Sequence, residues 1–166
     1  MEFKKRKNLR LKDYDYSENG LYFLTVCTKN KEKLLGNIVG DGVTGVPKTE
    51  LSPIGKIVEK YILSINNTEK ITVQNYVIMP DHIHLLIFVD NYTENLTSNG
   101  TSKTPSPTNS LVSHMVSTFK RFCNKEIGYN IWQRSFFDHV IRGEQDYLKH
   151  YRYIESNTSL WLKGTD

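Results

Sequence analysis

The chain has 166 residues, of which 38% are hydrophobic, 24% charged and 11% aromatic, and this composition excludes collagen-like, coiled-coil and wholly disordered proteins. A domain of this length buries roughly 70% of the surface that its unfolded chain exposes, so one hydrophobic core suffices. The sequence has neither an apolar run of about 18 residues nor an apolar signal-peptide core, which predicts a cytoplasmic protein with no membrane partner. Cys27 and Cys123 form neither a disulfide framework nor a zinc-binding pattern.

The positive charge is concentrated at the N-terminus. The formal net charge is +4, but residues 1–12 alone carry six cations against one anion. Basic arms of this kind contact nucleic-acid phosphates, although a solvated terminus fits the charge equally well. The cations considered for phosphate contacts are Lys4, Lys5, Arg6, Lys7 and Arg10.

The first half of the chain predicts a strand, a short companion strand and a helix. Residues 21–30 are rich in aromatic and β-branched types and follow a turn signal, so they predict a strand. Residues 34–39 predict its short companion, and residues 40–49 predict a glycine-rich connection. Ser52 and Pro53 supply a helix N-cap and a proline for the first turn, and apolar residues at helical spacing then predict a helix of about 14 residues.

The second half predicts a hairpin, two helices and a last strand. Apolar runs at 71–79 and 82–89 are separated only by Pro80-Asp81, which predicts a β-hairpin. Residues 91–110 are mostly Ser, Thr, Asn, Gly and Pro, which predicts a flexible insertion in a single domain. The remaining elements are a helix that begins at Leu111, a strand at 136–142 and a helix at 144–157. In the first of these helices, we expect Phe122 to face inward and Lys120, Arg121 and Lys125 to face outward.

Without the short companion strand, the order of elements is β-α-β-β-α-β with one further helix. This is the order of the ferredoxin-like fold. The sequence therefore predicts an α+β domain, in which an antiparallel sheet has helices on one face and a C-terminal helix is added. The fold names no activity, because unrelated functions share it.

Two histidines begin the second strand of the hairpin. Residues two apart in a strand point to the same face, so the roots of His82 and His84 lie about 7 Å apart and their imidazoles can converge on one cation. Imidazole is a common metal ligand, but two ligands are too few for tight binding. The alternative is that both histidines are structural and bond to the hairpin backbone.

The last predicted helix carries a stripe of polar residues. Asp146, His150, Tyr153 and Asn157 follow one another at helical spacing and share one face of the helix. Apolar residues line the opposite side, so we expect Tyr151 to lie in the core and Tyr153 to present its hydroxyl beside Asn157. A surface tyrosine without a function is the alternative.

Together, the histidine pair and the tyrosine resemble the single-tyrosine transposases of the HUH class, most closely the branch associated with repetitive extragenic palindromes (REPs). The resemblance rests first on His82-Ile83-His84 and on Tyr153 and Asn157, four residues apart on a later helix. It extends over most of the chain, through the stretches 10–17, 22–28, 76–84, 132–142 and 153–157. In one departure, Thr158 stands where the family usually has proline, which leaves the end of the helix open.

The resemblance implies an endonuclease and strand transferase that cleaves and rejoins single-stranded DNA containing a hairpin. Tyr153 would be the nucleophile and would leave a 5′-phosphotyrosine and a free 3′-hydroxyl. A phenol suits this role, since its phosphodiester can be displaced in turn by a DNA 3′-hydroxyl. His82, His84 and Asn157 would hold Mg²⁺ or Mn²⁺, which would polarise the scissile phosphate. A nucleoid-associated location is expected, and a homodimer stays open.

Further DNA contacts are expected from stacking and guanidinium groups, which are the usual means of gripping a single strand. The residues considered are Lys120, Arg121, Trp132, Arg134 and Arg142, with a core position as the alternative for Trp132. His114 and His139 are expected to be structural.

Two rival functions come from other classes of protein. The first is a DNA-binding module derived from a transposase, which grips hairpins without cutting them. The second is a histidine-triad nucleotide hydrolase, which needs a third histidine where this chain has Leu86. The first rival stays open, and the second is nearly excluded.

Overall fold

The computed structural model describes residues 19–40, 45–90 and 111–164. The basic arm at residues 1–12 and the insertion predicted at 91–110 therefore lie outside the described residues. No helix within the described ranges is long and apolar enough to cross a membrane. In chain order, the elements are β1 (Gly20–Cys27), the short 3-10 helix η1 (Lys29–Lys31), β2 (Gly36–Gly40), β3 (Pro47–Leu51), α1 (Pro53–Ile65), β4 (Ile71–Ile78), β5 (His82–Val89), α2 (Leu111–Ile127), β6 (Phe137–Val140) and α3 (Glu144–Leu162).

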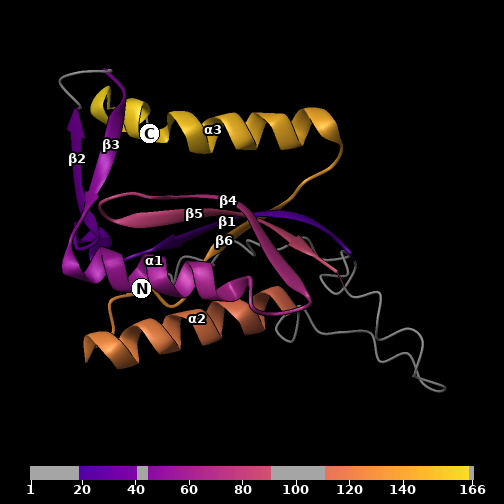
Figure 1. Cartoon of the computed structure of the whole chain (residues 1–166), viewed down its shortest axis with the longest axis horizontal. Helices are drawn as coiled ribbons and strands as arrows, with labels where there is room; N and C mark the ends of the chain where they lie inside the picture. The colour runs from indigo at the N-terminus through magenta and orange to yellow at the C-terminus, as the bar shows by residue number, and fades with distance from the viewer. Residues whose placement is uncertain (1–18, 41–44, 91–110, 165–166) are drawn as a thin grey trace, which may run out of the picture.

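A four-stranded sheet forms the middle layer of the molecule. Its strand order is β4-β5-β1-β6, and all neighbouring strands are antiparallel. Helices α1 and α2 cover one face of the sheet, and α3 lies across the other (Figure 1). The α+β, ferredoxin-like arrangement predicted from the order of elements is therefore confirmed, with the C-terminal helix on the face opposite α1 and α2.

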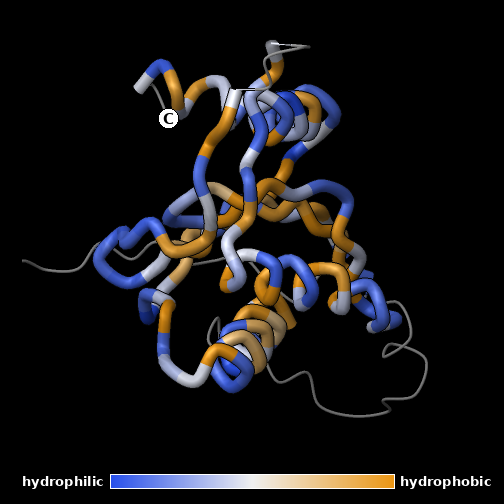
Figure 2. The backbone as a smooth tube through the Cα atoms, turned by 60° about the vertical axis from the view of Figure 1, so that its left-hand side comes forward, coloured by the Kyte–Doolittle hydropathy of each residue, from blue (hydrophilic) through white to orange (hydrophobic). Residues whose placement is uncertain are grey.

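The alternation of side chains along the two central strands creates two separate cores. On the face of α1 and α2, the larger core includes Leu24 and Val26 of β1 and Leu85 of β5. The residues of opposite phase, including Phe23 and Leu86, form a smaller core beneath α3. Figure 2 shows hydrophobic residues gathered in the middle of the molecule, between the helices. Because His82 and His84 share the phase of Leu86, the sheet presents both histidines to α3.

The start of α1 follows the sequence prediction. The hydroxyl of Ser52 accepts a hydrogen bond from the backbone N–H of Gly55 at 3.0 Å, and Pro53 occupies the first turn. Gly55 meets the neighbouring chain so closely that an added Cβ would lie 2.0 Å from the carbonyl oxygen of Leu35. This close approach joins the first turn of α1 to the segment that enters β2.

The connection predicted at residues 40–49 is wrong in its second half. Residues from Pro47 onward form β3, which pairs with β2 in a separate two-stranded sheet. The side chains of β3 alternate between half-buried and exposed, which is the pattern of a strand with one covered face. The hairpin of β2 and β3 stands at one end of the main sheet and reaches the C-terminal part of α3 (Figure 1).

Helix α3 continues past the predicted end at residue 157, as far as Leu162. Thr158 lies inside the helix and is buried, and its hydroxyl donates a hydrogen bond to the carbonyl oxygen of Pro47 at 2.7 Å. Threonine at this position keeps a backbone N–H that proline lacks, so the helix can continue. The departure from the family pattern thus coincides with a longer helix that is anchored to β3.

Two predicted core residues lie at the surface. Phe122 is 42% exposed and stacks on Tyr61 at the outer rim between α1 and α2. Tyr151 is 36% exposed, although Tyr147 and Ile154 of the same predicted apolar side pack in the smaller core. In both cases the spacing of apolar residues correctly predicted a helix. It did not determine which residues at the edge of the apolar face are buried.

Candidate active site

The two histidines at the start of β5 converge as the two-residue spacing predicts. His82 and His84 are both buried, and their Nε2 atoms lie 3.1 Å apart. Their rings meet edge to face, with centroids 4.6 Å apart. The pair therefore offers two ring nitrogens to a single point between the sheet and α3.

The other nitrogen of each ring is held by a neighbouring side chain. His82 Nδ1 lies 2.5 Å from Asp81 Oδ1, and His84 Nδ1 lies 2.8 Å from the hydroxyl of Thr25 on β1. With the carboxylate as acceptor, His82 carries its proton on Nδ1 and offers the lone pair of Nε2. These contacts with side chains fix the direction of both rings.

Helix α3 places its polar stripe over the histidine pair. The ring of Tyr153 meets the ring of His84 edge to face, with centroids 5.2 Å apart. The ring centroids of Trp161 and His82 lie 6.0 Å apart. Asn157 lies one turn from each of these aromatic residues and is fully buried. The side chain of Asn157 is therefore on the face of α3 that covers the histidines.

The donor set fits the divalent cation that the resemblance implies. Two nitrogen ligands of one octahedral cation, each about 2.1 Å from the ion, lie about 3 Å apart, and the Nε2 atoms of His82 and His84 match this separation. Asn157 adds a buried amide, whose carbonyl oxygen is a hard ligand suited to Mg²⁺ or Mn²⁺.

A second cluster of potential ligands lies near the N-terminal end of α3. His139 Nε2 lies 2.9 Å from Asp146 Oδ2, and His150 Nδ1 lies 3.1 Å from Asp146 Oδ1. Burial raises the pKa of Asp146, but the backbone N–H of Arg142 and the two histidines outweigh it and hold the pKa below its ordinary value. His139 of β6 bonds to Asp146 of α3, and nothing in the sequence indicated that β6 would bring it to Asp146 and His150.

Two residues considered for DNA contacts are engaged inside the protein. Trp132 is 2% exposed and packs against Phe119, so it is the core residue of the stated alternative and cannot stack on a base in this conformation. The ammonium group of Lys120 does not face outward, because it donates to the carbonyl oxygens of Gln133 and Ser135 at 2.8 and 3.1 Å. Burial lowers the pKa of Lys120 to about 8.

Three of the other cations are exposed and stay available for DNA. Arg121 lies on α2, on the far face of the sheet from α3. Arg134 follows Gln133, whose backbone N–H bonds to Cys27, the strand partner of His82. Arg142 immediately precedes α3. Lys4, Lys5, Arg6, Lys7 and Arg10 lie outside the described residues.

Sequence comparison decides which family contains this site. Residues 16–157, a span that includes both histidines, Tyr153 and Asn157, match the model of the IS200-like transposases. The chain belongs to the IS200-like transposase family. The resemblance stated from the sequence motifs is thereby confirmed.

Individual relatives agree with this assignment. An uncharacterized protein of Haemophilus influenzae is 32% identical over 168 residues, with 94% of this chain and 89% of the relative covered. A second protein of that organism, which carries the provisional name REP-associated tyrosine transposase, is 25% identical over 86% of this chain and 72% of its own length. This transposase is therefore related to the REP-associated branch.

A solved structure shows the same fold. It is a REP-associated tyrosine transposase bound to a REP hairpin, with a TM-score of 0.61 and 20% sequence identity. The match covers 95% of this chain and 75% of the other. At this level of identity the likeness supports the fold alone.

Proposed function

We propose that this transposase cleaves and rejoins single-stranded DNA that contains a hairpin, with Tyr153 as its nucleophile and with Mg²⁺ or Mn²⁺ held by His82, His84 and Asn157. The observation that carries the proposal is the contact between the rings of Tyr153 and His84, whose centroids lie 5.2 Å apart. Beside this contact, the Nε2 atoms of His82 and His84 lie 3.1 Å apart. Tyr153 of α3 and the two histidines of β5 therefore lie side by side, which supports their proposed roles as nucleophile and metal ligands.

Tyr153 performs the covalent step. Its hydroxyl oxygen attacks the scissile phosphorus and gives up its proton, the bond from phosphorus to the DNA 3′ oxygen breaks, and that oxygen takes up a proton. The products are a 5′-phosphotyrosine and a free 3′-hydroxyl. Because a phenolate is a good leaving group, a 3′-hydroxyl can reverse the step, so rejoining needs no nucleotide cofactor. When bound, the cation polarises the scissile phosphate.

The surrounding residues hold this chemistry in position. Asp81 and Thr25 fix the two imidazoles, so that both Nε2 atoms point to the same place. The ring of Phe23 packs against the rings of both His84 and Tyr153, with centroid distances of 5.0 and 6.0 Å. The nucleophile therefore rests on an apolar ring that sets its distance from the histidines and excludes water from one side.

A hairpin in single-stranded DNA is the substrate that the comparisons and the charge support. The solved relative is bound to a REP hairpin, and this chain carries six cations in its first twelve residues. Arg134 and Arg142 are exposed and can neutralise backbone phosphates.

The test is formation of a covalent adduct with labelled hairpin DNA in the presence of Mg²⁺ or Mn²⁺. We expect Tyr153→Phe to abolish the adduct and leave folding and DNA affinity near those of the wild type, because only a hydroxyl is lost. Tyr151→Phe, an exposed tyrosine of the same helix, is the matched control and should retain the adduct. Denaturing gels measure the adduct, and mass spectrometry locates it.

Each part of the proposal can fail separately. An adduct that survives Tyr153→Phe, or that maps to another tyrosine, refutes the nucleophile. Cleavage that persists in excess chelator refutes the metal. Tight hairpin binding by the wild type without any adduct would identify the non-enzymatic DNA-binding module instead.

A further inference from the structure

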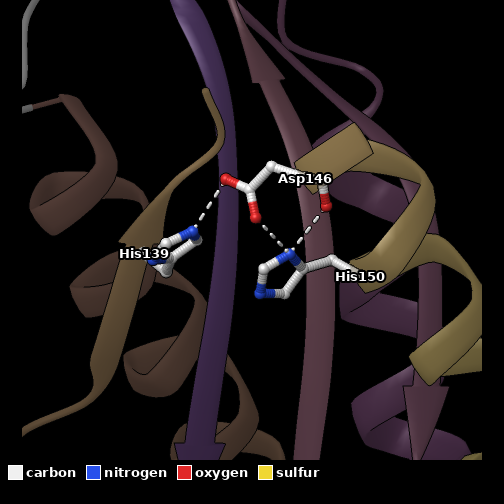
Figure 3. A group of neighbouring side chains, drawn as sticks. All are labelled: His139, Asp146 and His150. Atoms are coloured by element: carbon white, nitrogen blue, oxygen red, sulfur yellow. Dashed lines mark hydrogen bonds and ion pairs between the residues drawn. The ribbon is translucent and has the colours of Figure 1, made fainter. Parts of the chain in front are cut away.

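The cluster of His139, Asp146 and His150 has the composition and the spacing of a metal site. One potential ligand atom from each residue lies within 4.8 Å of the other two. Figure 3 shows both imidazoles next to the Asp146 carboxylate, His139 from β6 and the other two residues from α3. We propose that these three side chains bind a first-row transition-metal ion such as Zn²⁺ and thereby tie β6 to the first turns of α3.

The ligand types select the class of ion. Two imidazoles and one carboxylate are the ligands of Zn²⁺ and other borderline first-row ions, whereas Mg²⁺ prefers a shell of oxygen ligands. Three protein ligands leave at least one coordination position for water. The cluster differs from the site beneath Tyr153 in its oxygen ligand, which is the charged carboxylate of Asp146 and not the neutral amide of Asn157.

The electrostatics of the cluster suit a cation. Asp146 contributes a carboxylate between the two imidazoles, and carboxylate oxygens are common ligands of divalent cations. Each carboxylate oxygen already points to a different imidazole. An ion that enters between these groups displaces the hydrogen from each imidazole nitrogen that points to Asp146, and each displaced proton moves to the other ring nitrogen or to solvent.

The cluster is accessible from solvent yet anchored in the fold. The side chain of His139 is 41% exposed, whereas the side chains of Asp146 and His150 are 23% and 15% exposed. The rings of His139 and His150 stack with centroids 4.7 Å apart. An ion can therefore reach the cluster from the side of β6 and find two ligands that α3 already holds in place.

The cluster is a centre of its own. The ring of Phe23 lies between this cluster and the proposed catalytic site. Its centroid is 4.7 Å from that of His150 and 5.0 Å from that of His84. His150 lies one helical turn before Tyr153 on α3. A bound ion would therefore fix the helix that carries the nucleophile without contacting the DNA chemistry itself.

The test is metal binding by the full chain. We expect Zn²⁺ to raise the melting temperature of the wild type and Co²⁺ to give a visible absorption band. We expect His139→Ala and Asp146→Asn to lose both effects and to weaken Zn²⁺ binding, measured by calorimetry, by at least about tenfold. His114→Ala, which removes an exposed histidine on α2, should behave as the wild type. Circular dichroism confirms that each variant is folded.

Two further measurements separate the two metal sites. His84→Gln should leave Co²⁺ and Zn²⁺ bound at the His139 cluster, and nuclear magnetic resonance of the wild type should show Zn²⁺ shifting the imidazole signals of His139 and His150. Zn²⁺ binding that is unchanged in His139→Ala but lost in His84→Gln would overturn the proposal, as would a wild type whose melting temperature Zn²⁺ does not change. The proposal does not depend on strand cleavage, since Tyr153→Phe should bind Zn²⁺ as the wild type does.

Discussion

At the scale of single residues, the site depends on how two imidazole rings are oriented. His82 and His84 each have one nitrogen held by a neighbour, Asp81 or Thr25, and the other directed to the common point. A histidine that ligates a metal commonly donates its second N–H to an acceptor of this kind, which fixes the tautomer and the ring plane. The two neighbours are therefore part of the site although they would not touch the ion.

The first prediction concerns Asp81. We expect Asp81→Asn to weaken Mn²⁺ binding about 10- to 100-fold, because the amide no longer fixes the proton on His82 Nδ1. Thr25→Val should act in the same direction through His84. The matched control is Asp90→Asn, which removes an exposed carboxylate just beyond the other end of β5. Mn²⁺ titration followed by electron paramagnetic resonance measures the affinity, and equal affinities in all four proteins would contradict the positioning role.

The convergence of His82 and His84 could be predicted because strand geometry alone fixes it. Residues two apart share a face in any strand. The partner residues could not be predicted in this way, since Thr25 reaches His84 only after β1 pairs with β5. His139 was missed for the same reason. Its meeting with Asp146 depends on how β6 and α3 pack, and no local pattern in the sequence encodes that contact.

At the scale of elements, α3 is anchored near both ends. His139 of β6 bonds to Asp146 in its first turn, and Thr158 near its C-terminal end bonds to Pro47 of β3. Tyr153 lies between these anchors. The helix was predicted from its spacing, but its C-terminal part contacts β3, which the sequence interpretation took for part of a connection. A strand of five residues with modest alternation is too short to distinguish from a loop without its partner.

The second prediction concerns the first turn of α1. Alanine is the better helix former by about 1 kcal/mol, yet we expect Gly55→Ala to lower the free energy of unfolding by about 2 kcal/mol. Its Cβ would lie 2.0 Å from the carbonyl oxygen of Leu35, so the backbone must shift, and overpacking of this kind costs about 1–3 kcal/mol. Urea denaturation measures the change.

The control for this prediction is Lys56→Ala, an exposed position in the same turn, which should change the free energy of unfolding by less than about 0.5 kcal/mol. If Gly55→Ala is as stable as the wild type, the backbone of α1 and Leu35 can move apart without loss of free energy of unfolding. The glycine would then be dispensable for the packing of α1.

At the scale of the whole molecule, the two faces of the sheet carry different groups of residues. One face carries the larger core with α1 and α2, and the other carries the histidines and α3. The order of elements was enough to predict this layered fold, because few arrangements place four strands in one sheet when two helices connect them in the order β-α-β-β-α-β. It was not enough to show that the polar stripe of α3 faces the sheet, since that depends on which groups the opposite face offers.

The last prediction concerns the basic arm, which lies outside the described residues. The arm carries six cations against one anion, whereas the rest of the chain has a net charge of about −1. Deleting residues 2–8 removes four of those cations. If all four contact phosphates, the slope of log affinity against log salt should flatten by roughly three units, at about 0.7 per single-strand phosphate.

Preference among hairpin sequences should change little in this deletion, since phosphate contacts position a protein whereas base contacts specify a sequence. Fluorescence anisotropy with several hairpins at different salt concentrations measures both quantities. An unchanged salt slope with an altered preference would mean that the arm reads bases or DNA shape. If neither quantity changes, the arm is a solvated terminus, and the affinity for DNA must come from the folded domain, where Arg134 and Arg142 are exposed.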